Sequence, residues 1–314
     1  MVITVTLNPV LDRVIEIPNF RLGDVNEVVK ERARIAGGKG INVSRLLKLF
    51  DVPTLAVGWL GGRTGKEIKK KLEKEEICHD FIWIKEESRS NLTIIDPEKG
   101  SETHLVEKGP RVDKEDIEKL KEKISQWAVK AKIIVFSGSA PPGTGENIYF
   151  ELINLVKQVN SCVISVLDTR GAFLVEGIKA CPYLIKPNIR EFSEVRGKEF
   201  VSLEDVVKEV KRIVKEGVDV VVVSQGGGEV VTCVSPEEVF LFTPAQVNVI
   251  NTVGAGDALV GGMVAGIYKG KDILEACILG VAAGSASAEK GREKPLNKTR
   301  ITELVREIKV KKLT

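Results

Sequence analysis

The chain has 314 residues, of which 43% are hydrophobic and 29% are charged. This length and balance fit a soluble protein with a normal hydrophobic core, built as two domains or as one large α/β domain with an addition. The 47 basic and 44 acidic residues leave a net charge of +3, and lysine and glutamate are mixed along the chain. This charge pattern does not indicate a nucleic-acid surface, so we expect no nucleic-acid partner.

The sequence carries no sign of export or of membrane insertion. It starts with a strand-like run, lacks the layout of a signal peptide, and has no apolar run of membrane-spanning length. Its five cysteines are scattered without a Cys-x-x-Cys pair, which argues against a disulfide framework. We therefore expect a cytoplasmic protein that has no membrane partner.

Residues 2–7 form the first predicted strand, a β-branched run that ends at an Asn-Pro pair. Asp12 follows closely. Ligands of open parallel sheets bind beyond the carboxyl ends of the strands, so Asp12 is placed to accept hydrogen bonds from substrate hydroxyls. Alternatively it is only a turn aspartate beside a proline. Residues 13–34 have short extended patterns without a helical stripe, which predicts strands of a small sheet outside the main core.

The segment 36–43, Ala-Gly-Gly-Lys-Gly-Ile-Asn-Val, precedes a helical pattern. Its adjacent glycines, Gly37 and Gly38, permit a close approach of the backbone to a ligand. Lys39 and Asn42 offer an ammonium group and an amide group to a polar ligand. The same segment is also compatible with a hinge that binds nothing.

Residues 52–60 predict a strand, and a helix is expected from Thr64 to about Glu76. Residues 80–108 return to extended patterns, and together with the segment near 12–36 they predict a lid sheet of four or five strands. Arg89 lies inside this predicted lid, within the run Ser-Arg-Ser-Asn. It is suited to clamp a phosphate through two hydrogen bonds, or it is a solvated arginine on an edge strand.

From residue 113 onward, predicted helices and strands alternate regularly. The helices are expected at 113–127, 144–158 and 202–215, and the strands at 133–136, 162–167, 183–185 and 218–223. Alternation with long apolar strands predicts a parallel sheet that is covered on both faces. Polar loops follow these strands, and they contain Ser139, the run Lys186-Pro-Asn188-Ile-Arg-Glu191, and the run Ser224-Gln-Gly-Gly-Gly-Glu229. The Asn-x-x-Glu spacing is by itself a common helix start, and the three glycines fit a simple hairpin turn equally well.

The stretch 251–262, Asn-Thr-Val-Gly-Ala-Gly-Asp-Ala-Leu-Val-Gly-Gly, is where we place the chemistry. An apolar run at 247–250 predicts a strand before it and a helical pattern follows it, so Gly254, Ala255 and Gly256 lie at the helix start. Such a start has unpaired N–H groups and about +0.5 of a charge, which suits a phosphate or a developing oxyanion. Asp257 lies in the first turn beside this anion site, although a carboxylate there can also serve the helix charge alone.

The remaining features are less specific. Residues 273–288 predict a second helix, rich in small residues, that can pack closely on the first, and 301–308 predict an amphipathic helix. His79 and His104 both fall in the predicted lid and are interpreted as surface residues. The Gly-x-x-x-x-Gly-Lys-Ser/Thr loop, a Gly-x-Gly-x-x-Gly after the first strand and the protein-kinase motifs are absent from the sequence.

Two segments far apart in the chain resemble the signatures of one family, the ribokinase-like (PfkB-type) carbohydrate kinases. The stretch 251–262 resembles the C-terminal signature, and 36–43 resembles the N-terminal sugar-binding signature. The opening Thr-Leu-Asn-Pro-Val-Leu-Asp at 6–12 and the Arg-Ser-Asn at 89–91 resemble the hexose-phosphate kinases of this family. The similarity covers nearly the whole chain. It implies a ribokinase-like α/β fold in which a mostly parallel sheet has helices on both faces and a small β-sheet lid, all within a single kinase domain of residues 1–314.

The resemblance also implies an activity, the ATP-dependent phosphorylation of a ketohexose phosphate. The closest similarity is to family members that convert fructose 1-phosphate to fructose 1,6-bisphosphate. Tagatose 6-phosphate and fructose 6-phosphate are alternative substrates. A nucleoside or vitamin kinase of the same fold would not need Arg89, and a non-catalytic sugar-phosphate sensor would not need an intact base and anion hole. The implied cofactors are ATP and Mg²⁺, with a monovalent cation such as K⁺ as a further candidate. The implied partners are small molecules and a second copy of the chain, bound through the lid.

The resemblance gives each candidate residue a role. Asp257 would be the catalytic base, and Gly254, Ala255 and Gly256 would form the anion hole. The sugar phosphate would be bound by Asp12, Gly37, Gly38, Lys39, Asn42, Arg89 and Ser139. The nucleotide would contact Lys186, Asn188, Ser224, Gly226, Gly227, Gly228, Glu229, Gly254, Val281 and Ser285. Glu191 would help to hold Mg²⁺ through water.

Overall fold

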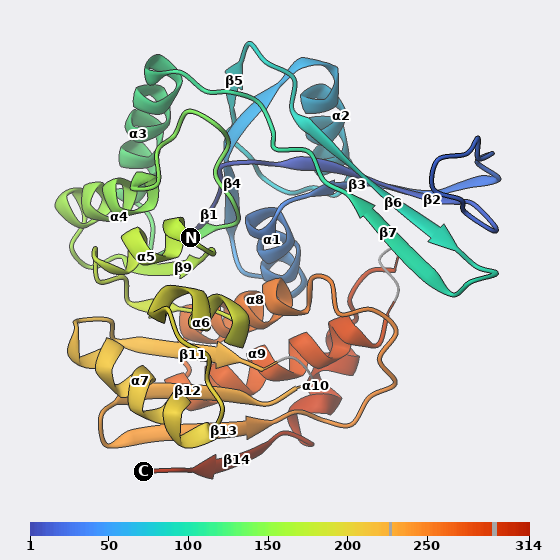
Figure 1. The fold of residues 1–314 in the computed structure, drawn as a ribbon. Coiled ribbons are helices and arrows are strands. Elements are labelled where there is room, and N and C mark those ends of the chain that lie inside the picture. The colour runs from blue at the N-terminus through green and yellow to red at the C-terminus, as the bar shows by residue number, and fades with distance from the viewer. Residues whose placement is uncertain (226–227, 291–293) are drawn as a thin grey trace.

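The structure is a computed structural model that describes residues 1–225, 228–290 and 294–314. A ten-stranded sheet crosses the molecule (Figure 1). From one edge to the other its strands are β14 (Lys309–Lys312), β13 (Glu238–Thr243), β12 (Val230–Ser235), β11 (Val220–Ser224), β10 (Leu184–Ile185), β9 (Ile164–Asp168), β8 (Ile133–Ser137), β1 (Val2–Thr6), β4 (Thr54–Gly61) and β5 (Ile82–Ile84). The strands from β11 to β5 pair in parallel, and β12, β13 and β14 pair antiparallel.

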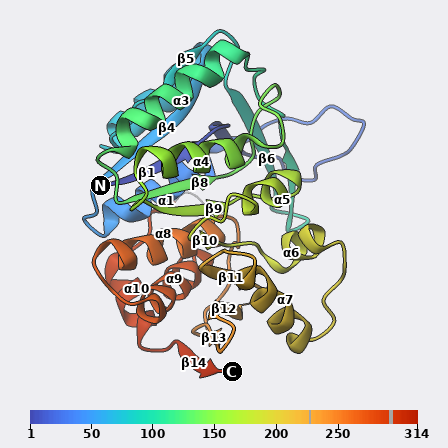
Figure 2. The same ribbon diagram turned by 90° about the vertical axis from the view of Figure 1, so that its left-hand side faces the viewer.

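Helices cover both faces of this sheet (Figures 1 and 2). This is why every residue of β1 and β8 is buried, although β1 contains two threonines and β8 ends in a serine. One face packs against α3 (Lys114–Ala128), α4 (Ile148–Val159), α5 (Ala172–Ile178), α6 (Ile189–Arg196) and α7 (Leu203–Lys215). The opposite face packs against α1 (Lys39–Leu49), α8 (Ala255–Tyr268), α9 (Ile273–Ala288) and α10 (Lys298–Val305). The ribokinase-like fold class expected from the sequence is confirmed. Among the described residues, no helix is long and apolar enough to cross a membrane.

A separate four-stranded sheet extends from one side of the molecule (Figure 1). Its order is β3 (Lys30–Gly37), β2 (Val10–Glu16), β6 (Arg89–Asp96) and β7 (Ser101–Leu105). β2 runs antiparallel to β3 and parallel to β6. Its own apolar cluster consists of Ile15, Ile17 and Ile94, while β7 is exposed throughout. A sheet with so small a core depends on the body of the protein for its position.

Residues 82–84 do not belong to the small sheet, and this part of the predicted lid is wrong. They form β5, which pairs in parallel with Trp59–Gly61 of β4 at the edge of the large sheet. Ile82 and Ile84 are buried in the main core beside Trp59, and this packing outweighs their closeness in sequence to the lid strands. α2 (Gly62–Lys74) links β4 to this region. His79 is therefore also outside the small sheet: its backbone bridges Ala56, and its side chain is 15% exposed.

Two further expectations fail near the C-terminus. Residues 247–250 are not a strand, because Val249 and Ile250 are more than half exposed and the segment has no neighbouring strand. Instead, the N–H groups of Ile250 and Asn251 donate to the carbonyl of Ala288. α8 thus follows an irregular segment that is fixed to the end of α9. The helix expected at 301–308 is α10, which ends at Val305, and the chain then adds β14 to the sheet edge.

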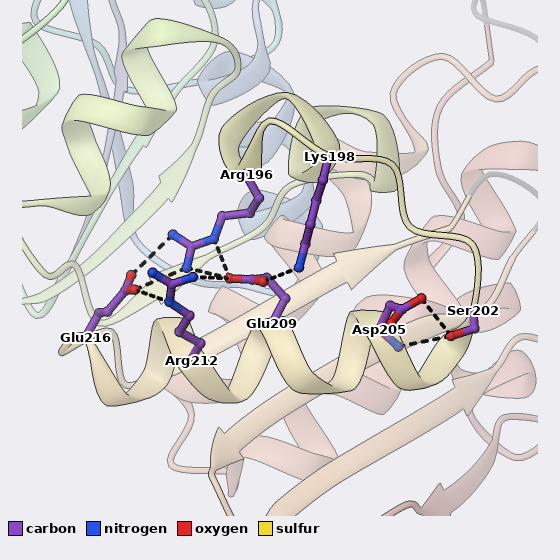
Figure 3. A network of polar contacts seen from close by, with 7 residues as sticks. All are labelled: Arg196, Lys198, Ser202, Asp205, Glu209, Arg212 and Glu216. Carbon is purple, nitrogen blue, oxygen red and sulfur yellow. Dashed lines mark hydrogen bonds and ion pairs between the residues drawn. The ribbon is translucent and has the colours of Figure 1, made fainter.

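A network of charged side chains connects the end of α6 to α7 (Figure 3). At its centre is Glu209, whose side chain is 5% exposed and contacts Arg196 at 2.5 Å and Lys198 at 2.6 Å. Burial alone would raise the pKa of Glu209, but hydrogen bonds from Lys198 and Arg196 outweigh it and hold the pKa below its ordinary value. Arg212 and Glu216 extend the network into solvent.

Candidate active site

Asp257 lies in the first turn of α8, whose N-cap residue, Gly254, takes the left-handed conformation at φ 88°. Its side chain is 7% exposed. Nδ2 of Asn42 donates a hydrogen bond to Oδ2 of Asp257 at 2.7 Å, although the two residues belong to helices far apart in sequence. Burial raises the pKa of Asp257 to about 6, while Lys39 opposes the rise. The carboxylate is therefore ionised at neutral pH and is more basic than an ordinary aspartate, as a general base should be.

A second buried carboxylate, Asp168, lies at the end of β9 and pairs with two lysines. Nζ of Lys39 is 3.0 Å and Nζ of Lys186 is 3.4 Å from its Oδ1. Burial opposes the charge of Asp168, but Lys186 and Lys39 outweigh this and lower its pKa. Oδ2 of Asp168 is buried without a hydrogen-bond partner among the described residues. The same arrangement raises the pKa of Lys39 despite burial, because Asp168 and Asp257 both face it.

Asp168 is not among the site residues predicted from the sequence. It sits in the run Asp-Thr-Arg-Gly with no recognisable spacing. The parallel pairing of β9 with β10 brings it beside Lys186, and the start of α1 brings Lys39 to it. Its position as the last residue of a buried apolar strand is a signal that was available. Strand ends of this kind form the binding edge of a parallel sheet.

The start of α8 concentrates positive potential. The N–H group of Ala255 donates to the carbonyl of Thr252 at 3.1 Å, and its expected place in the anion hole stays a prediction. The N–H groups of Gly256 and Asp257 have no partner among the described residues. A Cβ at Gly256 would lie 3.4 Å from Nζ of Lys186, so this ammonium group is beside the same turn. The start of α8 and the ammonium group of Lys186 together form a site for a phosphoryl group.

The predicted sugar-binding residues come together where the small sheet meets α1. A Cβ at Gly37 would lie 2.4 Å from Oδ2 of Asp12, so only glycine allows this approach. Nδ2 of Asn91 donates to Oδ1 of Asp12 at 3.1 Å. Asp12 itself lies within β2 and not beyond a strand end, because β2 begins at Val10. Gly38 caps α1 at φ 122°, which places Lys39 in its first turn.

Arg89 is not a solvated edge residue, because β6 lies between β2 and β7 in the small sheet. Its Nε and Nη2 donate to the carbonyl of Asn8 at 3.2 and 2.9 Å, and its Nη1 donates to the carbonyl of Glu107 at 3.3 Å. Burial lowers the pKa of Arg89, and Asp12 partly offsets this. Arg89 and Ser139 line one cavity of about 450 Å³ between the small sheet and the loop of residues 139–146.

The predicted nucleotide residues lie on the other side of Asp168. Asn188 and Glu191 cap each other, because each side chain accepts a hydrogen bond of 2.9 Å from the other's backbone N–H. Ser224 ends β11 and donates its N–H to the carbonyl of Pro187. Glu229 is exposed, and a Cβ at Gly228 would collide with Pro244. Gly226 and Gly227 lie outside the described residues.

Val281 and Ser285 belong to α9 and are both buried, at 3% and 7% exposure. The hydroxyl of Ser285 donates to the carbonyl of Val281 at 3.0 Å, and Val281 packs in the core with α8. A cavity of about 490 Å³ lies beside α9, and it is lined by other residues, including Asn248, Ile250, Ala286 and Glu289. The expected contact of Val281 and Ser285 with a nucleotide stays a prediction.

Known proteins resemble this chain over its full length. The 1-phosphofructokinase of Bacillus subtilis (strain 168) is 35% identical over 316 residues, which cover 100% of both chains. A tagatose-6-phosphate kinase of Staphylococcus epidermidis is 29% identical and covers 99% of both. Among solved structures, phosphofructokinase-2 from Escherichia coli in complex with potassium superimposes with a TM-score of 0.91 at 27% identity, covering 97% of this chain and 98% of that one. The same enzyme is also known in a tetrameric inhibited form.

The profile of the pfkB family carbohydrate kinases matches residues 5–299. This match contains both glycine-rich signatures, Asp257 and Asp168, and it agrees with the names of the relatives. The resemblance inferred from the sequence is thereby confirmed. The chain belongs to the pfkB family of carbohydrate kinases.

Proposed function

We propose that the chain transfers the γ-phosphoryl group of ATP to a hydroxyl of fructose 1-phosphate and forms fructose 1,6-bisphosphate. One observation carries the proposal: the buried carboxylate of Asp257, held by Asn42, lies beside the ammonium group of Lys186 and beside two N–H groups of α8 that donate to no described residue. Phosphoryl transfer needs an acceptor hydroxyl in line with the donor and positive charge around the transferred group. The full-length similarity to 1-phosphofructokinase supports the choice of substrate.

In this proposal Asp257 accepts the proton of the attacking hydroxyl. General-base help of this kind typically accelerates a reaction by about 10²–10⁴-fold. The N–H groups of Gly256 and Asp257 and the ammonium group of Lys186 stabilise the charge on the transferred phosphoryl group. Lys39 is paired with Asp168, so we propose that it also acts at this centre, and that other cations bind the phosphate of the sugar.

Mg²⁺ is expected with ATP, and the residues present fit it. The unpartnered Oδ2 of Asp168 and the Oε1 of Glu191, which the helix cap leaves free, are oxygen donors of the kind Mg²⁺ prefers. These two residues would hold the ion largely through water. When bound, it would neutralise charge on the nucleotide phosphates. A requirement for K⁺ is a further proposal, supported by the potassium complex of the Escherichia coli relative.

The small sheet is proposed to act as a lid within a single kinase domain. Asp12, Gly37, Gly38 and Asn42 would hold the sugar hydroxyls, and Arg89 and Ser139 its phosphate. Closure over the sugar would exclude water, which otherwise competes for the phosphoryl group. The edges of this sheet also offer surface for a second copy of the chain, and the tetrameric form of the Escherichia coli relative supports an oligomer. A cytoplasmic location is proposed, supported by five cysteines that are scattered along the sequence.

A coupled assay of ADP release with Mg-ATP tests the substrate. Fructose 1-phosphate, fructose 6-phosphate, tagatose 6-phosphate and fructose are compared by kcat/KM. The proposal expects the highest value for fructose 1-phosphate. A preference for tagatose 6-phosphate, the substrate named for the Staphylococcus epidermidis relative, would keep the mechanism and replace the substrate. Activity on fructose alone would contradict a phosphate-binding role for Arg89.

The substitution Arg89→Ala is expected to raise KM for the sugar phosphate by about tenfold or more, because charged hydrogen bonds to the phosphate are lost. KM for ATP should change by less than about twofold. A matched control is Arg13→Ala, which removes an arginine of the same sheet that pairs with Glu31 at the surface. Steady-state kinetics with each substrate varied in turn separate the two effects. An equal rise in both KM values would argue against the clamp, because Arg89 also braces the carbonyls of Asn8 and Glu107.

A further inference from the structure

Arg170 lies beside the proposed phosphate site, at the end of β9. Two hydrogen bonds fix its backbone segment against the neighbouring strand end: Gly138 N–H donates to the carbonyl of Asp168 at 2.9 Å, and the hydroxyl of Thr169 donates to the carbonyl of Gly138 at 2.8 Å. This arrangement places Arg170 next to Ser139. Both line the same cavity of about 450 Å³ as Arg89. The three residues come from three separate parts of the chain.

The charge of Arg170 has no counter-charge in contact among the described residues. Its guanidinium forms no hydrogen bond or ion pair with any described residue, and it is exposed to the cavity mouth. Of the acidic residues that line the cavity, Glu107 already accepts the N–H of Ser90, and Glu146 is exposed. Burial lowers the pKa of Arg89, and Arg170 is near enough to lower it further, while the carboxylates of Asp12 and Glu107 oppose this. Two arginines that line one cavity and repel each other indicate a place for an anion.

Arg89 alone cannot surround a phosphate. A guanidinium has five N–H donors, and hydrogen bonds to the carbonyls of Asn8 and Glu107 occupy three of those of Arg89. The remaining donors can meet only part of a phosphate monoester, which has three strong acceptor oxygens and nearly two negative charges. No described residue accepts a hydrogen bond from the guanidinium of Arg170, which lines the same cavity. It supplies the charge and the hydrogen bonds that Arg89 lacks.

We propose that Arg170 is a specificity-determining residue that binds the phosphate group of the sugar substrate together with Arg89 and Ser139. This inference rests on the proposed function, because it names the part of that site that recognises a phosphorylated sugar. The consequence is discrimination: the enzyme would select a hexose phosphate over the free hexose through two arginines from different layers of the fold. A bidentate arginine contact to phosphate has a geometry that lysine does not reproduce.

The kinetic test compares Arg170→Gln with Arg170→Lys and with the control Arg306→Gln, which removes an exposed arginine at the end of α10. Arg170→Gln is expected to raise KM for fructose 1-phosphate by about tenfold or more. Arg170→Lys should restore part of this loss. KM for ATP and the kinetics of the control should stay within about twofold of the wild type. An Arg170→Gln enzyme with an unchanged KM for the sugar phosphate would overturn the inference and leave the proposed function intact.

A binding test keeps the two proposals distinguishable. Isothermal titration without ATP measures the dissociation constants of fructose 1-phosphate, fructose 6-phosphate and inorganic phosphate for the wild type, Arg170→Gln, Arg89→Gln and the double variant. The inference expects each single variant to weaken binding, and the double variant to lose less than the product of the two single effects, because both arginines hold one phosphate. If the double variant weakens binding by the full product of the two single effects, the two arginines do not share one phosphate and the inference is wrong. A wild type that binds these phosphates but never turns over a sugar phosphate would refute the proposed function alone.

Discussion

The substitution Asp257→Asn is expected to lower kcat by several hundredfold or more while KM for both substrates changes little. Asparagine has nearly the same shape, and its side-chain oxygen can still accept the hydrogen bond that Asn42 donates to Asp257. The N–H groups at the start of α8 stay in place as well. Only the ability to accept a proton is lost, so the effect should appear in the chemical step. A kcat within about tenfold of the wild type would show that Asp257 is not the base.

The pH profile tests the same carboxylate independently. The pKa of Asp257 is about 6 because burial raises it, and the base works only when deprotonated. Activity should therefore be full above this value and fall about tenfold per pH unit as the pH drops below it. The phosphate of the substrate titrates in the same range, so a second variant is needed. The hydrogen bond from Asn42 lowers the pKa of Asp257, so Asn42→Ala should move the acid limb to higher pH. An acid limb that came from the substrate phosphate would stay at the same pH in this variant.

The sequence was sufficient to predict the local parts of this site. A glycine before a helix with an aspartate in its first turn is a pattern of adjacent residues, and α8 begins where that pattern placed it. The same holds for Gly38 and Lys39 at the start of α1. Each of these depends on backbone conformations that neighbouring residue types determine.

The contacts between these parts could not be predicted, because they depend on the register of the sheet. Asn42 bonds to Asp257 only because α1 and α8 pack on the same face. Asp168 acquires its role from three parallel strands and two lysines, none of which are its sequence neighbours. Apolar runs were misleading for the same reason. Residues 82–84 and 247–250 look alike as short strands, but only the first has a neighbouring strand to pair with.

The second large effect is expected in stability. Asp168→Asn should lower the free energy of unfolding by about 3–5 kcal/mol, because it leaves buried ammonium groups without their carboxylate. The side chain of Lys186 is 3% exposed and cannot turn to solvent, whereas that of Lys39 is 31% exposed and can do so in part. Denaturant unfolding without ligands measures the change. The pKa of Asp168 is lower in the folded protein than its ordinary value of 3.8. The ionised carboxylate therefore stabilises the fold fully above pH 3.8, and this stabilisation is lost as the pH falls through the pKa of the folded state.

Glu209→Gln is the matched control, since it also removes a nearly buried, ion-paired carboxylate, one that lies in the network of α6 and α7. Its partners Lys198 and Arg212 have side chains 48% and 68% exposed, so water can solvate them again. Its third partner, Arg196, is only 15% exposed but keeps its ion pair with Glu216. We therefore expect a loss of about 1 kcal/mol. The double variant Asp168→Asn/Lys186→Met removes the buried ammonium group of Lys186 together with the carboxylate that neutralises it. This double variant should be more stable than Asp168→Asn alone. If Asp168→Asn does not fold, the unfolding of the double variant can still be measured. Equal losses for Asp168→Asn and Glu209→Gln would mean that the active-site lysines are solvated well enough to need no buried counter-charge.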